Sequence, residues 1–476
     1  MTDSIERTLH RLDGQLPGRV SRPGDNRYIA ATALWAKPIG RMPRAVVHCR
    51  TPQDVQSAIR AARDCDLPLS VRGGGHDWAG RALCDGLVID LSGMNEVVVG
   101  TDRRTARISG GARAADVVAM TDPLGLVAVT GSVGAVGMAG LTLGGGYGPL
   151  IGRFGLALDN IIAADVVLAD GRIVTAEDDR EEELFWALRG GGGNFGVVTA
   201  MRHRLHDLPN VLSGMLIYPF SEAKAVLERC VDLGASMPEE LTVQLGLVAG
   251  PDGAPMVFIV PTWCGVPGQG DDQVAPLLKL GTLLDNRLDA VRYGTSLAEF
   301  NAYLVNGQRT FMETCWLPAL DSGSIDVLIE AMAAAVSPGC AIFTHEFRGA
   351  AARVPAEATA FGLRRDHVLV EILATFVDHS DQIEEQRHRQ WARAALQAFD
   401  AMALPGGYPN LLAGDDPDRA AQSYGRNAAR LIEAKRYYDP DNVFRSAIPL
   451  PVGPSAGRAR VAANAGKARV PEDAVN

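Results

Sequence analysis

The chain lacks the cysteine patterns of secreted and zinc-binding proteins. Its seven cysteines are scattered and odd in number, and no Cys-x-x-Cys pair occurs. This usage fits a reducing compartment and no structural zinc, so we expect a cytoplasmic protein without a bound metal. The first residues contain no basic segment followed by an apolar run, and we therefore expect no signal peptide.

An excess of positive charge is also missing. The 46 Lys and Arg residues are outnumbered by 56 Asp and Glu residues, which gives a net charge of −10. This balance argues against a nucleic-acid or anionic-membrane partner. The longest uncharged run, residues 123–152, is long enough to span a membrane but too rich in glycine for a transmembrane helix. A chain of 476 residues is long enough for two or three domains.

Glycine, in contrast, is abundant, and one glycine loop organises the rest of the chain. Residues 69–78 read Leu-Ser-Val-Arg-Gly-Gly-Gly-His-Asp-Trp, which predicts a strand followed by a glycine loop. Without Cβ atoms the backbone can approach a ligand and point its N–H groups at an anion. Arg72 adds a positive fork for phosphate oxygens, and His76 stands at the mouth of the loop. These residues alone fit an ordinary glycine-rich turn equally well.

A helix precedes this loop. Thr51, Pro52 and Asp54 form a helix start, with Thr as the N-cap, Pro at the first position and an acid at the third. The helix and the strand after it predict a β-α-β unit, with the glycine loop at a strand end where α/β folds bind ligands.

Two further glycine runs follow, at residues 130–148 and 189–196. The first is too apolar for a flexible linker, and a ligand packed against the backbone would explain its glycines. The second contains Gly191, Gly193 and Gly196 in a Gly-x-Gly-x-x-Gly pattern. It follows a predicted helix and leads into a strand, the reverse of a dinucleotide fingerprint, so we reject a Rossmann fold.

The remaining chain has fewer glycines. Residues 210–400 alternate short apolar strands with helical runs, which predicts an α+β domain with an antiparallel sheet. One helix is expected at residues 419–436. The tail from about residue 452 has no apolar period and is expected to be disordered.

Seven motifs in this order resemble those of the berberine-bridge-enzyme-like flavoproteins, within the vanillyl-alcohol oxidase and p-cresol methylhydroxylase superfamily. The resemblance covers residues 25–450 and is closest to the nicotine oxidases and to bacterial natural-product oxidases. The motifs lie at residues 72–76, 143–148, 155–160, 169–171, 184–187, 190–199 and 438–444.

The resemblance implies an α+β fold of the p-cresol methylhydroxylase type. Its FAD-binding domain would comprise residues 1–206 and 406–450. A substrate domain at 207–405, built on an antiparallel sheet covered by helices, would be inserted between them. Residues 451–476 would form the disordered tail.

The resemblance also implies FAD, bonded covalently through its 8α-methyl group to His76. Many relatives attach the flavin a second time through a cysteine, but Val133 stands at that position, so a single attachment is expected. The residues that the resemblance places around FAD are Arg72, Gly73, Gly74, Gly75, His76, Asp77, Gly131, Val136, Gly137, Gly140, Gly144, Gly145, Tyr147, Gly148, Asp159, Asn160, Gly196, Val198 and Asn410.

The implied activity is that of an oxidase, which takes a hydride from a small alcohol, phenol or amine and passes the electrons to O₂. Val136 falls at the position that gates oxygen. Glu346 and Tyr408 are the expected catalytic residues, although Glu346 beside Arg348 fits a structural ion pair equally well. Glu371 and His345 are further candidates, which also fit ordinary sheet residues with satisfied side chains. A flavin-bearing binding protein and a dehydrogenase that does not use O₂ are the alternatives. Either a monomer or a homodimer fits the sequence.

Overall fold

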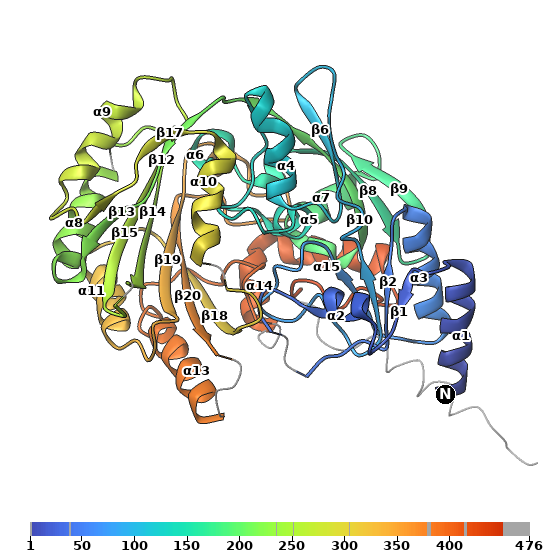
Figure 1. The fold of residues 1–476 in the computed structure, drawn as a ribbon. Coiled ribbons are helices and arrows are strands. Elements are labelled where there is room, and N and C mark those ends of the chain that lie inside the picture. The colour runs from blue at the N-terminus through green and yellow to red at the C-terminus, as the bar shows by residue number, and fades with distance from the viewer. Residues whose placement is uncertain are drawn as a thin grey trace, which may run out of the picture.

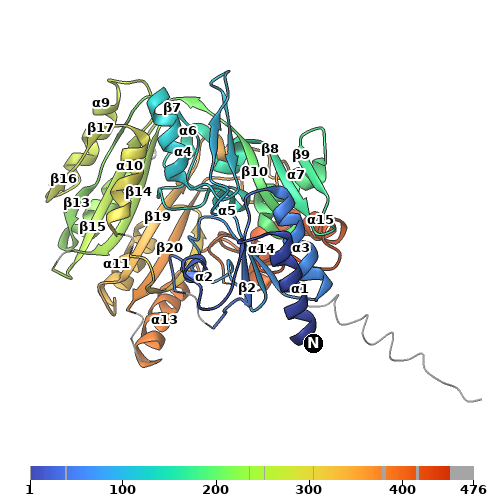
Figure 2. The ribbon, with the colours of Figure 1, turned by 45° about the vertical axis from the view of Figure 1, so that its right-hand side comes forward.

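The computed structural model describes residues 2–450 except for 38–39, 235, 251, 304, 378–381 and 414–416. The tail that was predicted to be disordered, residues 451–476, lies outside the described residues. The chain forms two lobes that lie side by side, one around two smaller sheets and the other around one large sheet (Figure 1, Figure 2). Within the described ranges no helix is long and apolar enough to cross a membrane.

The first lobe begins with the predicted β-α-β unit. A four-stranded sheet has the order β1, β2, β4, β3, and its last three strands run parallel. Thr51 and Asp54 cap the connecting helix reciprocally, as the sequence predicts. The elements are α1 (Thr2–Gln15), β1 (Val20–Ser21), α2 (Asn26–Thr32), β2 (Ala45–His48), α3 (Pro52–Asp64), β3 (Leu69–Arg72) and β4 (Leu87–Asp90). Because β3 ends at Arg72, the first glycine loop leaves from the carboxyl end of a parallel strand.

A five-stranded antiparallel sheet completes the first lobe, in the order β5, β6, β10, β8, β9. Its elements are β5 (Val97–Val99), β6 (Thr105–Ser109), α4 (Ala114–Thr121), α5 (Met138–Gly144), α6 (Ile151–Phe154), β8 (Ile161–Leu168), β9 (Ile173–Glu177), α7 (Glu182–Gly191) and β10 (Gly196–Arg204). Part of the densest glycine run forms α5, and a short pair, β7 (Leu126–Val127) with β11 (His206–Asp207), lies beside the sheet. The last glycine run lies between α7 and β10, so the rejection of a Rossmann fold is correct.

The second lobe is a nine-stranded sheet in which every pair is antiparallel, as predicted. The order is β16, β13, β15, β14, β19, β20, β18, with β12 and β17 beside this path. The strands are β12 (Val211–Ser213), β13 (Leu216–Pro219), β14 (Leu241–Ala249), β15 (Pro255–Trp263), β16 (Asp285–Asn286), β17 (Asp289–Val291), β18 (Arg309–Leu317), β19 (Cys340–Phe347) and β20 (His367–Phe376). Three helices cover its outer face, α8 (Ala223–Gly234), α11 (Ser322–Ala333) and α13 (Gln382–Gln397) (Figure 1). Shorter helices, α9 (Gly270–Val274), α10 (Tyr293–Glu299) and α12 (Ala350–Arg353), lie around it.

The C-terminal segment returns to the first lobe. The single helix predicted at 419–436 is wrong, because Gly425 adopts a left-handed φ of 50° and divides it into α14 (Pro417–Tyr424) and α15 (Ala428–Tyr438). At the end of α15 the buried Lys435 Nζ donates to Asp439 Oδ2 at 2.6 Å and to the carbonyl oxygens of Asn194 and Phe444 at 2.8 and 2.9 Å. These bonds fix residues 439–444 against the last glycine run.

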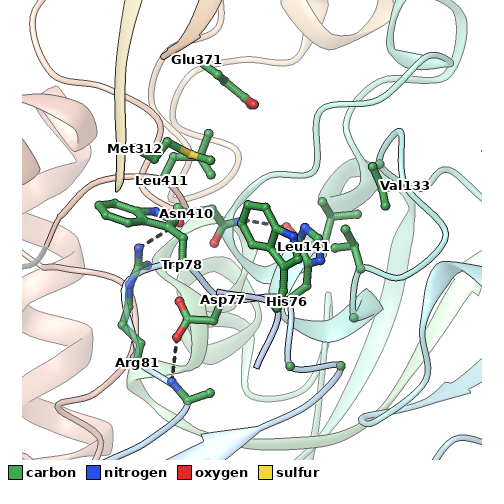
Figure 3. Close-up of a pocket in the computed structure, with 18 of the residues that line it drawn as sticks. His76, Asp77, Trp78, Arg81, Val133, Leu141, Met312, Glu371, Asn410 and Leu411 are labelled. Carbon is green, nitrogen blue, oxygen red and sulfur yellow. Dashed lines mark hydrogen bonds between the residues drawn. The ribbon is translucent and has the colours of Figure 1, made fainter. Parts of the chain in front are cut away.

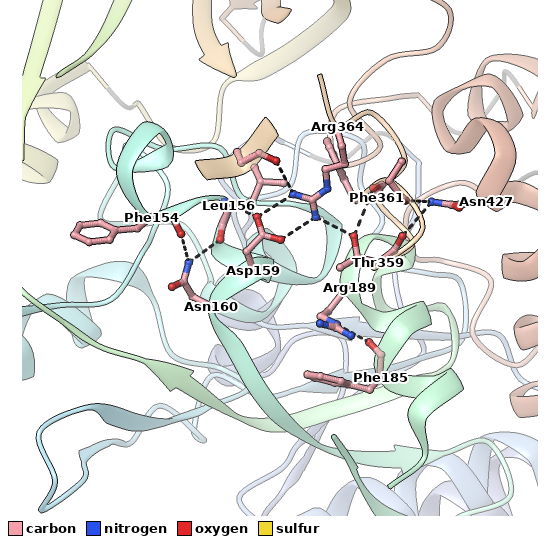
Figure 4. Close-up of polar contacts among 12 residues, drawn as sticks. Phe154, Leu156, Asp159, Asn160, Phe185, Arg189, Thr359, Phe361, Arg364 and Asn427 are labelled. Atoms are coloured by element: carbon pink, nitrogen blue, oxygen red, sulfur yellow. Dashed lines mark hydrogen bonds and ion pairs between the residues drawn. The ribbon is translucent and has the colours of Figure 1, made fainter. Parts of the chain in front are cut away.

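A buried ion pair joins the two lobes (Figure 4). Arg364, between α12 and β20, donates through both terminal nitrogens to the Asp159 carboxylate, at 2.8 and 2.9 Å. Arg364 also donates to Thr359 Oγ1 at 2.9 Å, and its side chain is only 1 % exposed. Since an unpaired buried carboxylate is costly, this pair should oppose separation of the lobes.

We predict that Arg364→Met lowers the free energy of unfolding by about 3–5 kcal/mol, because Asp159 would keep its charge without its partner. Arg107→Met is the matched control, since Arg107 and Asp165 are paired at the surface, and its cost should stay below about 1 kcal/mol. Denaturant unfolding of both variants measures the difference. Equal losses would contradict the role given to Arg364.

Candidate active site

A cavity of about 670 Å³ lies where the two lobes meet. The first lobe lines it with the three glycine runs and residues 444–448, and the second lobe lines it with the inner face of the large sheet. Figure 3 shows side chains from these separate segments facing one space. The volume is within the usual range for sites of small molecules and cofactors.

The floor of the cavity is backbone rather than side chain. A Cβ atom on Gly74 would lie 2.5 Å from the Cα of Gly137, so two glycine runs touch where neither could carry a side chain. Gly140 and Gly193 line the cavity, and a Cβ on either would meet no protein atom within 4 Å. A floor of exposed backbone under open space fits a flat, extended cofactor that carries phosphates.

His76 lies on the cavity wall and its ring stacks on that of Trp35. Burial lowers the pKa of His76 to about 4, so the imidazole is neutral at pH 7 and keeps a free lone pair. The next residue, Asp77, accepts the backbone N–H groups of Ala79 and Ala82 at 3.2 and 2.9 Å (Figure 3). Asp77 therefore shapes the turn that carries His76.

Arg72 does not have the predicted place. It is buried outside the cavity lining, and its Nη1 donates to Asp90 Oδ1 at 3.0 Å. The other oxygen of Asp90 lies 2.9 Å from His48 Nδ1. The expectation of a phosphate fork is therefore wrong, because a buried carboxylate holds the guanidinium under the loop.

Tyr408 and Asn410 reach the cavity from the C-terminal segment. The Tyr408 hydroxyl oxygen accepts the N–H of Gly146 at 2.8 Å and Asn410 Nδ2 at 2.9 Å. Burial nevertheless raises the pKa of Tyr408 to about 12. With its oxygen occupied by two donors, the hydroxyl keeps its own hydrogen available for a partner in the cavity.

Tyr147 also lines the cavity, but its hydroxyl is used within the protein. It lies 2.6 Å from His367 Nε2 and accepts Trp316 Nε1 at 3.1 Å. Since His367 Nδ1 lies 2.7 Å from the carbonyl oxygen of Arg365, Nδ1 carries the hydrogen and Nε2 accepts from Tyr147. The second lobe thus fixes the ring of a first-lobe tyrosine.

Polar side chains are scarce on the inner face of the large sheet. Glu371 Oε1 lies 3.3 Å from His345 Nε2, and Gln244 Nε2 lies 3.4 Å from the same nitrogen. All three line the cavity, and Glu371 points into it in Figure 3. Apolar side chains surround them: Met215, Ile217, Val248, Met256, Phe258, Met312, Phe343 and Leu373.

Glu346 does not line this cavity. Its Oε2 accepts the N–H of Val243 at 3.1 Å and lies 3.4 Å from Arg348 Nε. Since His345 faces the cavity, its neighbour Glu346 points to the other side of the strand. Burial raises the pKa of Glu346, and Arg348 opposes that shift. The geometry favours the structural ion pair over the predicted base.

The other predicted cofactor residues divide into two groups. Those in the cavity lining are Gly73, Gly74, Gly75, Asp77, Gly131, Val136, Gly137, Gly140, Tyr147, Gly196, Val198 and Asn410. Outside the lining lie Arg72, Gly144, Gly145, Gly148, Asp159 and Asn160. Gly144 and Gly145 instead leave room for other side chains. A Cβ on Gly144 would clash with Asn410, and a Cβ on Gly145 would clash with Tyr408. Asp159 pairs with Arg364, and Asn160 donates to the carbonyl oxygens of Phe154 and Leu156 (Figure 4).

Several lining residues had no signal in the sequence: Trp35, Arg81, Ser446, Ala447 and Ile448. They reach the cavity from turns and loops, as do Trp78 and Phe444, which end two of the stretches described above. Arg81 donates to the carbonyl oxygens of Asn410 and Leu412 at 3.0 and 2.9 Å and so holds the Tyr408 segment. Across the described residues no cluster of three or more His, Cys, Asp or Glu side chains could hold a metal ion.

Comparison with known proteins accounts for this arrangement. Residues 43–177 match the FAD binding domain model, and residues 407–451 match the berberine and berberine-like model. The (R)-6-hydroxynicotine oxidase of Paenarthrobacter nicotinovorans is 30% identical over 90% of this chain and 96% of its own length. The FAD-linked oxidoreductase aurO of Gibberella zeae is 29% identical over 92% of this chain and 86% of its own.

Solved structures of related proteins have the same fold. The crystal structure of 6-hydroxy-D-nicotine oxidase from Arthrobacter nicotinovorans has a TM-score of 0.81 and 29% identity, covering 90% of this chain and 97% of that one. A berberine bridge enzyme variant with (S)-reticuline has a TM-score of 0.82 at 20% identity, covering 94% and 99% of the two chains, and so shares the fold. The chain belongs to the berberine-bridge-enzyme-like FAD-linked oxidoreductases of the p-cresol methylhydroxylase superfamily. Its cofactor is FAD.

We predict that His367 makes the protein sensitive to acid. Burial lowers the pKa of His367 to about 3, against about 6.5 in the unfolded chain. Its contribution to stability is therefore complete above about pH 7 and declines as the pH falls, by about 3 kcal/mol at pH 4.5. Urea unfolding at pH 7 and 4.5 should show a loss smaller by that amount in His367→Gln than in the parent. His10→Gln, at an exposed site, should leave the loss unchanged.

Proposed function

We propose that this protein is an oxidase that removes a hydride from a small, largely apolar alcohol, phenol or amine and reduces O₂ to H₂O₂. One observation carries the proposal: Glu371 and the free hydrogen of Tyr408 face a cavity whose sheet side is otherwise mostly apolar. The carboxylate is close enough to affect the pKa values of Tyr408, Tyr147 and His76. A proton acceptor and a hydrogen-bond donor thus face the same cavity.

Bound FAD supplies the two-electron acceptor for the hydride and returns the electrons to O₂. The backbone of Gly73, Gly74 and Gly75 would hold the phosphates, and His76 would form the single covalent bond through its neutral imidazole. Gly137 and Val136, which line the cavity, would support the ring system. In this protein residues 1–206 and 406–450 would form the FAD-binding domain and residues 207–405 the substrate domain. Its location would be cytoplasmic.

Glu371 accepts the proton that leaves the substrate oxygen or nitrogen, while His345 orients the carboxylate and Gln244 contacts His345. Tyr408 donates a hydrogen bond from its hydroxyl group to the substrate oxygen or nitrogen and so positions the reacting carbon. The apolar residues around them exclude water and favour a ring-bearing substrate over a sugar, whose hydroxyl groups would remain unpaired there. Glu371 replaces Glu346 in this assignment, because Glu346 is held by Arg348 on the far side of the strand.

Two valines support the use of O₂. Val136 and Val133 both line the cavity beside the glycine floor, and neither side chain carries a polar atom. Val136 leaves a small apolar approach for oxygen, and Val133 stands where doubly linked relatives carry a cysteine. The direct test is anaerobic mixing of the holoenzyme with a panel of apolar alcohols, phenols and amines. A productive compound bleaches the flavin, and air then restores the colour with release of peroxide.

We predict that acid-precipitated parent protein stays yellow, while His76→Ala releases its FAD into the supernatant. The reason is that His76 provides the only attachment when Val133 replaces the second. Absorbance of pellet and supernatant measures the outcome, and Val133→Ala is the control that should stay yellow. A yellow pellet from His76→Ala would disprove the single attachment.

We further predict that Glu371→Gln lowers the rate of anaerobic flavin reduction about 10²-fold or more, the usual effect of losing a general base. Its FAD content should match that of the parent. Glu346→Gln should instead reduce the melting temperature and leave reduction near normal, because its carboxylate holds Arg348. If Glu346→Gln alone slowed reduction, the base would have to be reassigned to Glu346.

A further inference from the structure

The side chain of Trp35 packs against the imidazole of His76. The rings of Trp35 and His76 have centroids 4.4 Å apart and planes inclined by only 11°, which is a stacked pair. Trp35 lines the cavity together with His76, in the short segment between α2 and β2. No sequence pattern pointed to it.

The backbone of Trp35 is held on both sides. Its N–H donates to the carbonyl oxygen of Gly75 at 2.9 Å, one residue before His76. Its own carbonyl oxygen accepts the N–H of Gly307 at 2.8 Å, and Ala36 forms a parallel bridge with Gln308, ahead of β18. These bonds fix the indole relative to the glycine loop and to the edge of the large sheet.

His76 has little else to orient it. None of the described residues forms a hydrogen bond with its ring, and the neighbouring Asp77 carboxylate is occupied by the N–H groups of Ala79 and Ala82. Asp77, Arg113 and Glu371 are the charged groups close enough to affect it, and only through space. Among the described residues, Trp35 is the one whose aromatic ring stacks on the imidazole and can restrict its rotation.

We propose that Trp35 is a positioning residue for flavin attachment: it holds the imidazole of His76 in the orientation that reaches the 8α-methyl group. This inference rests on the proposed attachment at His76. In the overall reaction one C–H bond of the methyl group and the N–H bond of the imidazole break, and a C–N bond forms. The two protons and two electrons released reduce dioxygen to hydrogen peroxide.

Bond formation requires the nitrogen to lie close to the methyl carbon with its lone pair aligned. An imidazole free to turn about its side-chain bonds spends most of its time in other orientations. Losing one aromatic stack should therefore slow attachment about three- to tenfold. A smaller flat ring at position 35 should preserve most of the effect, whereas a branched aliphatic side chain should not.

The test follows covalent and total flavin during expression of full-length parent, Trp35→Leu and Trp35→Phe. Samples taken at intervals after induction are purified and acid-precipitated, and the covalent share of all bound FAD is measured. We expect this share to rise three- to tenfold more slowly in Trp35→Leu and close to the parental rate in Trp35→Phe. Trp391→Leu, which empties a buried site on α13 away from the cavity, should lower the melting temperature without changing the share.

Equal covalent shares in Trp35→Leu and parent at every time would overturn the inference, as would a lower total FAD content with an unchanged share. Should Trp35→Leu fail to fold, Trp35→Met and Trp35→Phe provide the same contrast between a flexible side chain and a flat ring. If His76 is not the attachment site, the outcome is different. The parent would then lose its FAD on acid precipitation, or the His76→Ala variant would keep it.

Discussion

The cavity depends on one contact between two stretches of backbone. Gly74 and Gly137 approach so closely that a Cβ on Gly137 would lie 2.6 Å from the nitrogen of Gly74. Hydrogen bonds from Ala114 N to Val136 O and from Met138 N to Ala112 O, both 2.9 Å, hold the second run in place from behind. The contact therefore sets the position of His76 relative to Val136. A side chain at either glycine would force the two runs apart.

A second constraint is the alternation of side chains in the large sheet. Phe343 pairs directly with Glu371, and Ala341 with Leu373, so these side chains share the inner face. The residues between them, such as Ile342 and Ile372, pack against the covering helices. One pleat thus separates the chemistry of the cavity from the hydrophobic core behind it.

The local parts of this fold were predictable from the sequence. The Thr51 cap, the glycine loop after β3 and the antiparallel strands all follow from short-range patterns of residue type. Side chains alternate along β19, so that His345 faces the cavity and Glu346 the opposite side. Which face meets the cavity was not predictable, because that depends on helices far along the chain. Sequence reasoning therefore favoured Glu346 over Glu371 and His345, whereas in the fold Glu371 and His345 line the cavity and Glu346 does not.

Long-range partners account for the other differences. Arg72 was predicted to bind phosphate, but in the fold it pairs with Asp90 on the neighbouring strand β4. Asp90 is distant in the sequence, so this pairing could not be predicted from the residues around Arg72. Trp35 and Arg81 stand in turns, where no periodicity marks a side chain as facing a cavity. Gly144 and Gly145 are needed for the side chains of Asn410 and Tyr408, which are more than 250 residues later in the sequence. Such requirements become visible only when distant segments are side by side.

The division of the cavity wall between the two lobes has a consequence for how this protein could diversify. The backbone floor and His76 belong to the first lobe, and the apolar inner face of the sheet belongs to the second. Every second residue of β13 and β15 can change its size or polarity while the alternate residues keep the helix-covered core intact and Glu371 on β20 is retained. New specificities can therefore arise by point substitution on one sheet face, with the redox machinery inherited unchanged.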